Sequence, residues 1–190
     1  MSIDLLFQNI EKHIVLTDKE KSMLSDFLEE KTFRKRHYFV QEGQYANYSA
    51  FVTKGCMRSY YVDTNGFEHI LQFAIEDWWI ADMMSYTTGK EARLNIDALE
   101  NTEALLISRE NQLKLFEVCP KFEKYFRIIT ENGIVSIQNR LLENMSLLAP
   151  ERYANFVKKY PILNQRLPQT QIAAFLGITP EFLSKIRNRG

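Results

Sequence analysis

The stretch QTQIAAFLGITPEFLSKIRNRG, Gln169 to Gly190, holds two short helical patterns on either side of Gly177. Ala173 provides a small residue where two helices would cross, and Gly177 can take the positive φ that a tight turn requires. Thr179 offers a hydroxyl that can cap a second helix, and Pro180 suits the first position of that helix. The apolar residues left to pack beneath the turn are Ile172, Leu176, Ile178, Leu183 and Ile186. This combination predicts a helix-turn-helix, although another helical hairpin with a glycine turn would share part of it.

The predicted second helix keeps a polar face after its apolar residues are assigned. Glutamate can accept a hydrogen bond from cytosine N4, lysine can donate to guanine, and hydroxyls and arginines suit phosphates. A face that binds double-stranded DNA and a face that is merely solvated would both be polar, so both interpretations stay open. The candidate DNA-binding residues are Gln169, Thr170, Thr179, Pro180, Glu181, Ser184, Lys185, Arg187 and Asn188, with Arg189 flanking them.

The net charge of zero hides an asymmetry along the chain. Residues 151–190 carry seven Lys and Arg against two Glu, a net of +5, so the remainder, with 17 basic and 22 acidic residues, carries −5. A basic end on an acidic body is typical of a nucleic-acid-binding module attached to another domain. A basic solvated surface would give the same count.

Length and composition limit the class of protein to which this C-terminal segment can belong. The 190 residues suit one large or two small domains, and 45% hydrophobic with 25% charged residues is ordinary for a globular chain. The sequence has no run of 18 apolar residues, and its start, MSIDLLFQNIEKH, has Asp4 where a secretory signal would be positive. We therefore expect a cytoplasmic protein without a membrane partner.

The cysteines and histidines give little support to a metal site. Cys56 and Cys119 lie far apart in the sequence, so we expect reduced thiols and no disulfide. His13, His37 and His69 form no pair at a spacing that would place two imidazoles on one metal. An enzyme on a cupin-like barrel would need two close histidines and a carboxylate. We expect no metal, no cofactor and no enzymatic activity.

The first two thirds of the chain change from a helical to a strand pattern. Thr17 and Glu20 form a capping-box sequence before an apolar stripe, which predicts a helix over about residues 18–30. From Phe33 to about Ser108, β-branched and aromatic residues are interrupted by glycines every 11 or 12 residues, and TNGFE (Thr64 to Glu68) is a hairpin signal. These features predict a small antiparallel β-sandwich or barrel.

A long helix is predicted from about Pro120, with a second helix over residues 151–160 beyond Pro150. The apolar residues of the long helix recur at steps of three and four, which is typical of a coiled-coil contact between two chains. Packing of the upstream half on the chain's own β domain is the alternative, and both stay open. The candidate dimer-interface residues are Phe126, Ile134, Ile137, Leu141 and Met145.

Taken together, the sequence resembles the Crp/Fnr family of bacterial transcription regulators over nearly all of its length. The resemblance rests on the following segments: QEG (Gln41 to Gly43), VTKGCMRSYYVDTNGFE (Val52 to Glu68), ALENTEALLIS (Ala98 to Ser108) and LPQTQIAAFLGITPEFLSKIR (Leu167 to Arg187). The last of these is the most specific.

The resemblance implies an α+β fold and a domain order. It implies a jelly-roll-like antiparallel β-roll with flanking helices over residues 1–119, similar to a cyclic-nucleotide-binding domain. A dimerisation helix over 120–149 and a winged helix-turn-helix over 150–190 would follow, although too few residues follow Ile186 for a further strand. The implied function is a homodimeric transcription regulator that binds a pseudo-palindromic operator, with RNA polymerase as a further partner to consider.

The resemblance also implies an effector pocket that contains Ala81, Asp82, Met83 and Arg93. Cyclic-nucleotide-binding members use a Gly-Glu pair at the ribose and an Arg followed by a small polar residue at the phosphate. Here the corresponding positions are Ala81-Asp82 and Ala92-Arg93, and Leu94 stands where a hydroxyl is expected. We therefore expect an unknown small effector other than cyclic AMP, or none.

Other sensing chemistries of the family have less support in this sequence. An iron-sulfur form needs four thiolates, which two distant cysteines do not supply. A haem form would need an axial ligand such as His69, which an ordinary strand residue explains as well. A sensor or scaffold that acts through protein partners without specific DNA binding is the alternative to the regulator.

Overall fold

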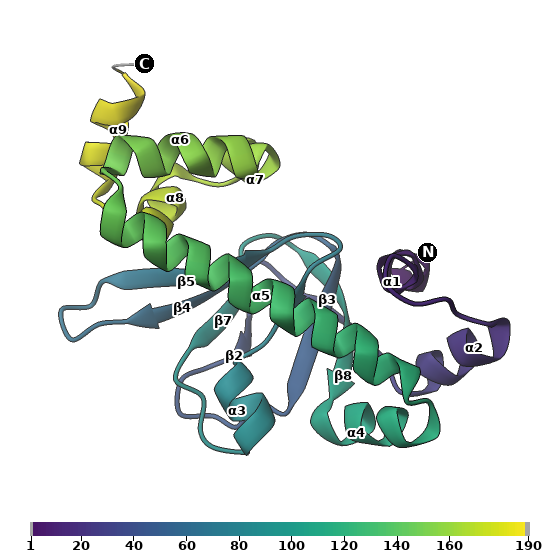
Figure 1. Cartoon of the computed structure of the whole chain (residues 1–190). Coiled ribbons are helices and arrows are strands. Elements are labelled where there is room, and N and C mark those ends of the chain that lie inside the picture. Colours follow the sequence, from purple (N-terminus) through teal and green to yellow (C-terminus); the bar gives the residue numbers. More distant parts are fainter. Residues whose placement is uncertain (1, 189–190) are drawn as a thin grey trace. The chain divides into compact units, whose positions relative to one another are not determined.

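The computed structural model describes residues 2–188, so Arg189 lies outside the described residues. The chain divides into two compact units: residues up to Tyr61 with Leu71–Ile129, and Val62–Ile70 with the residues from Thr130 on. The helices of the first unit are α1 (Ser2–Glu11), α2 (Asp18–Asp26), α3 (Met83–Thr88), α4 (Arg109–Val118) and the start of α5 (Lys121–Ser146), as Figure 1 shows.

The strands form two four-stranded sheets, in the orders β1-β8-β3-β6 and β2-β7-β4-β5. The strand bounds are β1 Glu29–Phe33, β2 Tyr38–Val40, β3 Tyr48–Lys54, β4 Met57–Val62, β5 Glu68–Ala74, β6 Trp79–Ile80, β7 Asn95–Ala98 and β8 Thr102–Ser108. The described registers are antiparallel, for example Glu29 opposite Leu106 and Arg58 opposite Asp97. This arrangement confirms the predicted antiparallel β-roll within an α+β fold.

Two hydrophobic cores hold the first unit together. One contains inward-facing residues from both sheets, among them Val52, Met57 and Ile96. The other covers the opposite face of the β1-β8-β3-β6 sheet, where Phe51 and Leu105 meet the apolar faces of the helices α1, α2, α4 and α5. Figure 1 shows these helices beside β3 and β8. The helices therefore bury one face of one sheet, and the two sheets bury each other.

Gly55 shows why the predicted turn positions need glycine. It has a φ of 97°, a region that side chains with a Cβ rarely adopt. A Cβ at this position would lie 2.6 Å from the carbonyl oxygen of Asn101, well inside contact distance. The hairpin predicted at TNGFE is also present, because Asp63 N donates to Phe67 O at 3.0 Å between β4 and β5.

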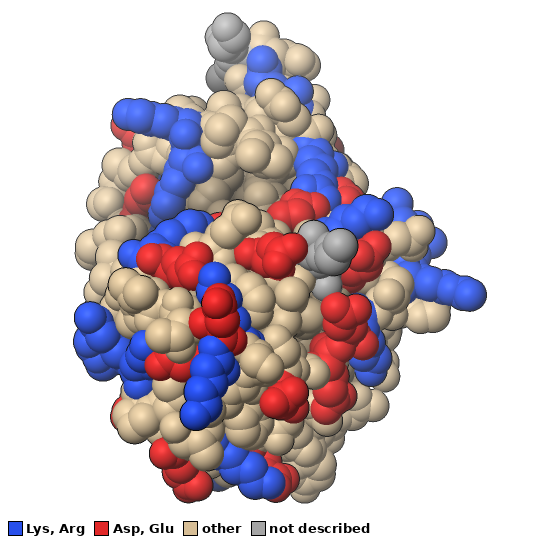
Figure 2. Space-filling view, turned by 90° about the vertical axis from the view of Figure 1, so that its right-hand side faces the viewer, with Lys and Arg blue, Asp and Glu red and all other residues tan. Residues whose placement is uncertain are grey.

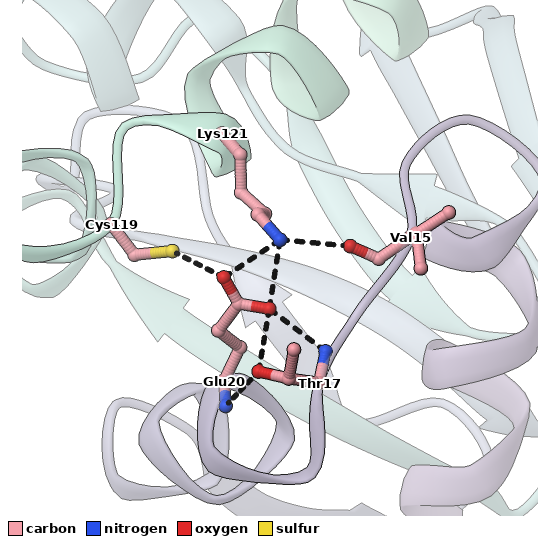
Figure 3. Close-up of polar contacts among 5 residues, drawn as sticks. All are labelled: Val15, Thr17, Glu20, Cys119 and Lys121. Atoms are coloured by element: carbon pink, nitrogen blue, oxygen red, sulfur yellow. Dashed lines mark hydrogen bonds and ion pairs between the residues drawn. The ribbon is translucent and has the colours of Figure 1, made fainter.

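The predicted capping box of α2 is present and connects α2 to α5. Thr17 N donates to Glu20 Oε2 at 2.8 Å, and Glu20 N donates to Thr17 Oγ1. Figure 3 shows the Lys121 ammonium donating to the same carboxylate and to the Val15 carbonyl oxygen, while the buried Cys119 thiol donates to Glu20 Oε1 at 3.6 Å. The Lys121 hydrogen bond, followed by those from Thr17, lowers the pKa of Glu20 to about 2. Burial, followed by the negative charge of Glu20, raises the pKa of the Cys119 thiol.

The helix predicted over residues 18–30 is shorter than expected. It ends at Asp26, and β1 begins at Glu29, where the backbone pairs with β8. Pairing with a strand more than 70 residues away therefore ends the helical pattern that Phe27 and Leu28 would have continued. The helices α1, α3 and α4 were not predicted as separate elements.

Basic and acidic side chains lie among one another on the protein surface. Figure 2 shows Lys and Arg interspersed with Asp and Glu on one face. Lys21 pairs with Glu11 across α1 and α2, and Lys114 pairs with Glu110 along α4. None of the helices within residues 2–188 is long and apolar enough to cross a membrane.

The second unit is helical apart from the tip of the β4-β5 hairpin. Beyond α5 it contains α6 (Ala149–Lys159), α7 (Pro161–Arg166), α8 (Gln169–Leu176) and α9 (Pro180–Arg187). The short helix α7 was not predicted. Residues 149–188 contain no strand, so the wing that the resemblance implied is missing from this part of the chain.

Candidate functional site

The helix-turn-helix is present at the predicted residues. The helix α8 begins at Gln169 and ends at Leu176, and its C-cap, Gly177, has φ 67° and ψ 37°. Ile178 N donates to Ala173 O at 3.0 Å, which closes the turn. Thr179 caps α9, its hydroxyl oxygen accepting from Phe182 N at 3.2 Å, and Pro180 occupies the first turn. Each feature of the predicted turn is therefore used as the sequence indicated.

Apolar side chains beneath the turn hold α8 and α9 in place. Ile172, Ala173 and Leu183 are fully or almost fully buried, and Leu176 is buried as well. Ile178 and Ile186 are half-buried. Such burial fixes the rotation of α9 about its own axis, so the face opposite Leu183 is presented to solvent in a defined way.

The predicted DNA-binding residues are exposed, apart from Gln169. Glu181, Ser184 and Lys185 are exposed on α9, and Thr170 is exposed on α8, whereas Gln169 is half-buried. The remaining members of the set are also exposed: Thr179, Pro180, Arg187 and Asn188. Phe182, which the sequence did not single out, is 45% exposed on the same helix.

Arg152 is half-buried within the second unit and does not lie on the basic surface to which its charge was assigned. It counted toward the basic tail, yet its guanidinium donates to Leu147 O at 3.1 Å and to Leu176 O at 3.2 Å. These are carbonyls at the ends of α5 and α8, where helices leave acceptors without an intrahelical partner. Arg152 therefore braces the motif and takes no part in its exposed face.

Arg140 on α5 is a second bracing residue that the sequence did not reveal. Its guanidinium donates to Ile70 O at 3.2 Å and lies over the ring of Phe175 on α8, 4.7 Å from the centroid. Burial lowers the pKa of Arg140. Phe175 also contacts Phe156 of α6, with ring centroids 5.5 Å apart. One side chain thus joins the hairpin tip, α5 and the helix-turn-helix.

The downstream part of α5 carries an exposed apolar seam. We define the seam as Ile134, Ile137, Leu141 and Met145, whose side chains are 51% to 77% exposed. Large apolar side chains at helical spacing with this exposure are unusual unless a partner covers them. Val135, Leu142 and Leu148 add to the exposed apolar surface beside the seam.

Phe126 differs from the seam residues. Its ring contacts Trp79, Phe116 and Tyr125 at centroid distances of 5.2–5.5 Å, so it packs against the second core of the first unit. The alternative of packing on the chain's own β domain therefore describes the upstream half of α5. Phe126 lies apart from the four residues with which it was grouped.

Asp82 is buried and fully engaged by backbone groups. It is 1% exposed. Its Oδ1 accepts from Ser85 N at 2.9 Å, and its Oδ2 accepts from Arg93 N at 3.0 Å and Leu94 N at 3.1 Å. The carboxylate therefore faces into the protein and does not point toward a ligand. Local sequence could not show this, because Arg93 and Leu94 lie 11 and 12 residues away.

The other predicted pocket residues are not brought together into one cavity. An open depression of about 700 Å³ is lined by Arg93 and Met84, and by Tyr45 and Lys90, among others. Met83 is exposed, Ala81 is half-buried, and neither lines this depression. Arg93 is exposed, so its guanidinium can reach solvent.

His69, weighed as a haem ligand, lies after the hairpin turn. Its Nε2 is 2.8 Å from Asp63 Oδ2. This contact, followed by the Phe67 backbone N–H, lowers the pKa of Asp63. Within residues 2–188, no three His, Cys, Asp or Glu side chains gather as metal ligands do.

Comparison with known proteins agrees with this geometry. Residues 30–118 match the family model described as the cyclic nucleotide-binding domain. FixK2 from Bradyrhizobium japonicum matches with a TM-score of 0.73 and 22% identity, over 85% of this chain and 83% of its own. The c-di-GMP responsive global regulator CLP of Xanthomonas campestris matches with a TM-score of 0.73 and 12% identity, over 91% of each chain. No curated protein sequence matches the chain.

A third match fixes the class of fold. It is a structure described as a transcriptional regulator of the Crp/Fnr family from Eubacterium rectale, with a TM-score of 0.69 and 16% identity, over 92% of this chain and 83% of its own. The antiparallel β-roll within residues 30–118 is thus similar to a cyclic nucleotide-binding domain. The chain as a whole has the fold of the Crp/Fnr regulators, which confirms the resemblance seen in the sequence.

Proposed function

We propose that the protein is a DNA-binding transcription regulator of the Crp/Fnr type. The observation that carries this proposal is the polar face of α9, which is capped at Thr179, held by the buried Leu183 and exposed along its length. A capped helix with a fixed rotation can enter the major groove with its first turns foremost.

The residues of this face suit the two tasks of a DNA reader. Glu181 and Lys185 can meet base edges, because a carboxylate accepts from cytosine and an ammonium donates to guanine. Arg187 and the hydroxyl of Ser184 suit phosphate oxygens. Glu181, Ser184 and Lys185 are exposed and share one side of α9, and the exposed Arg187 flanks them.

The functional form that we propose is a two-fold homodimer. The α5 seam would be covered by the same seam of a second chain, since a self-complementary apolar stripe is what an isologous interface requires. A dimer of this kind binds a pseudo-palindromic operator with half-sites about one helical turn apart.

The β-roll would serve as the sensor domain of this regulator. The β-roll would respond to a small effector other than cyclic AMP. The DNA-bound regulator could also contact RNA polymerase. Its role would be regulatory and not enzymatic, and it would act in the cytoplasm, where the DNA lies.

Selection of bound sequences from a random duplex pool tests the proposal. We expect an enriched inverted repeat, with binding that weakens as salt rises because phosphate contacts release counterions. The variant Ser184→Asp provides the control, since it places a negative charge against the DNA on an exposed position without disturbing the buried side of α9. No enrichment, or equal enrichment with this variant, would favour a scaffold that acts through protein partners.

A further inference from the structure

We propose that Asp82 is a built-in substitute for a ligand phosphate, so that the β-roll keeps its ligand-binding segment ordered without a cyclic nucleotide. The inference concerns residues 82–94, the segment that the resemblance places at the effector site. It agrees with the expectation that cyclic AMP is not the effector, because the residues of this chain do not fit that ligand.

The first observation is how completely the carboxylate is satisfied. Three backbone N–H groups, from Ser85, Arg93 and Leu94, point at its two oxygens over 2.9–3.1 Å. Two of them are consecutive and lie across the segment from Asp82. Convergent backbone N–H groups form an anion-binding concavity, and burial of a charge is tolerated when such donors surround it.

The second observation is which donors the carboxylate occupies. The nucleotide-binding members of the family hold the phosphate with an Arg and a small polar residue. The resemblance places Ala92 and Arg93 of this chain at the positions of that pair. Here the backbone donors at and next to this pair are already bonded to Asp82, and the side chain at Ala92 is a buried methyl group where an arginine would stand. An incoming phosphate would find its N–H donors taken and its arginine missing.

The third observation is that the rest of the segment is tied down as well. Ala92 exchanges backbone hydrogen bonds with the loop before β3, donating to Gln44 O at 2.7 Å and accepting from Gly43 N at 2.8 Å. Ser85 Oγ donates to Lys90 O at 2.6 Å and accepts from Ala46 N at 2.8 Å. The segment is thus held from both sides by groups of the chain itself, which is the ordering that a bound nucleotide would otherwise supply.

The experiment removes the internal anion and offers small external ones. Melting temperatures are measured for the wild type, Asp82→Ala and Ser85→Ala, each with chloride, formate, inorganic phosphate or cyclic AMP at equal ionic strength. Formate is the smallest carboxylate and matches the group that Asp82→Ala removes. Ser85→Ala is the matched control, because it removes hydrogen bonds from the same segment but leaves the carboxylate in place.

The expected results differ among the three proteins. No anion should raise the wild-type melting temperature beyond the effect of chloride. Asp82→Ala should melt at a lower temperature, and formate or phosphate should restore part of the loss in a saturable way, since a ligand that binds only the folded state stabilises it by mass action. Ser85→Ala should melt lower and show no such recovery. A saturable rise of the wild type with cyclic AMP or phosphate, or an Asp82→Ala protein that no anion stabilises, would overturn the proposal.

A second variant covers the case in which Asp82→Ala does not fold. Asp82→Asn keeps the volume and one carbonyl acceptor, so it should lose part of the hydrogen bonding to Arg93 and Leu94. Hydrogen exchange at these two amides should then be faster than in the wild type, while exchange at the Ala92 amide, bonded to Gln44 O, should change less. Unchanged exchange at Arg93 and Leu94 would count against the proposal.

The consequence for regulation rests on the proposed function. DNA affinity should be the same, within about twofold, with and without cyclic AMP, because the ligand has no effect on the population of the binding-competent state. A requirement for cyclic AMP would overturn the inference. If the protein bound no DNA at all, the proposed function would fail, whereas the melting and exchange results would still decide the role of Asp82.

Discussion

Arg152 donates a hydrogen bond to the carbonyl oxygen of Leu176 at 3.2 Å, across 24 residues of sequence. The same guanidinium reaches Leu147 O at the end of α5. A charged donor thus closes two helix ends that would otherwise hold unpaired acceptors. The contact makes Arg152 part of the frame on which α8 and α9 rest.

We expect Arg152→Met to destabilise the helix-turn-helix by about 2–4 kcal/mol, because two hydrogen bonds from a charged donor are lost and partly buried carbonyls stay unpaired. Denaturant unfolding followed by circular dichroism measures this change. Lys158→Met, an exposed lysine on the same helix, is the matched control and should alter stability little. Equal effects of the two changes would show that Arg152 is not a brace.

Arg140→Lys tests the contact between α5 and Phe175. Lysine keeps the charge and can still donate to Ile70 O, but it lacks the flat guanidinium that covers the ring. We expect a loss of about 1–2 kcal/mol in the free energy of unfolding, the range for a largely desolvated cation–π contact. Arg34→Lys, at an exposed position between β1 and β2, provides the comparison. A loss of the same size in that variant would contradict the argument.

Glu181→Ala tests the proposed docking of α9 on DNA. In the wild type, the carboxylate of Glu181 would be repelled by phosphates unless it accepted a hydrogen bond from a cytosine amino group. We expect the variant to lose preference at one base pair of each half-site, about 1–3 kcal/mol of discrimination, with equal or higher non-specific affinity. Selection from a random pool measures this. An unchanged consensus would mean that α9 is not docked with its first turn in the groove.

Lys185→Ala and Arg187→Ala separate base contacts from phosphate contacts. Arg187→Ala should weaken binding to all sequences about equally and flatten the salt dependence, because a phosphate contact is lost. Lys185→Ala should weaken binding and also shift base preference. Affinities at several salt concentrations distinguish the two, and a steeper salt dependence in either variant would be inconsistent with these roles.

Ile137→Glu combined with Leu141→Glu tests the proposed dimer. Two charges in the middle of the seam should yield monomers that bind the operator weakly, as shown by light scattering and gel shift. Asn139→Glu, an exposed position on another side of α5, should leave the dimer intact. A monomeric wild type at micromolar concentration would show that the seam does not join two chains.

The capping-box carboxylate predicts a pH dependence of stability. The pKa of Glu20 is about 2 in the folded protein, below its ordinary value of 4.5. A lowered pKa stabilises the folded state above the unfolded-state value, and this contribution disappears as the pH falls from about 4.5 to 2. Glu20→Gln should therefore show a smaller loss of stability over this range than the wild type. Glu117→Gln neutralises an exposed carboxylate of α4 and should retain the wild-type slope.

Several elements were predictable because their signals are local. Thr17 with Glu20, the TNGFE hairpin and the Gly177-Thr179-Pro180 turn each depend on residues within a few positions of one another. The end of α2 was not predictable in this way, because pairing of Glu29 with Leu106 decides it. Helices of six residues such as α3 and α7 give too few turns for a clear period.

The candidate site shows the same division. The exposed face of α9 follows from one helical period around Leu183. The two arginine braces, by contrast, join carbonyls that are remote in sequence, so Arg152 counted as one more positive charge. Asp82 was placed at the effector site, but its partners Arg93 and Leu94 appear only when the chain is folded. Helical period therefore predicted which side chains of α9 are exposed, whereas tertiary contacts decided the positions of Arg152 and Asp82.

The exposed seam of α5 would have a consequence for the dose response of the proposed regulator. If two chains must meet before either reads its half-site, the concentration of DNA-binding species rises with the square of the chain concentration while monomers predominate. Promoter occupancy would then change more steeply than synthesis of the protein itself. If the proposed dimer forms, a helix side that is 51% to 77% exposed in one chain would convert small differences in expression into larger differences in output, without any ligand.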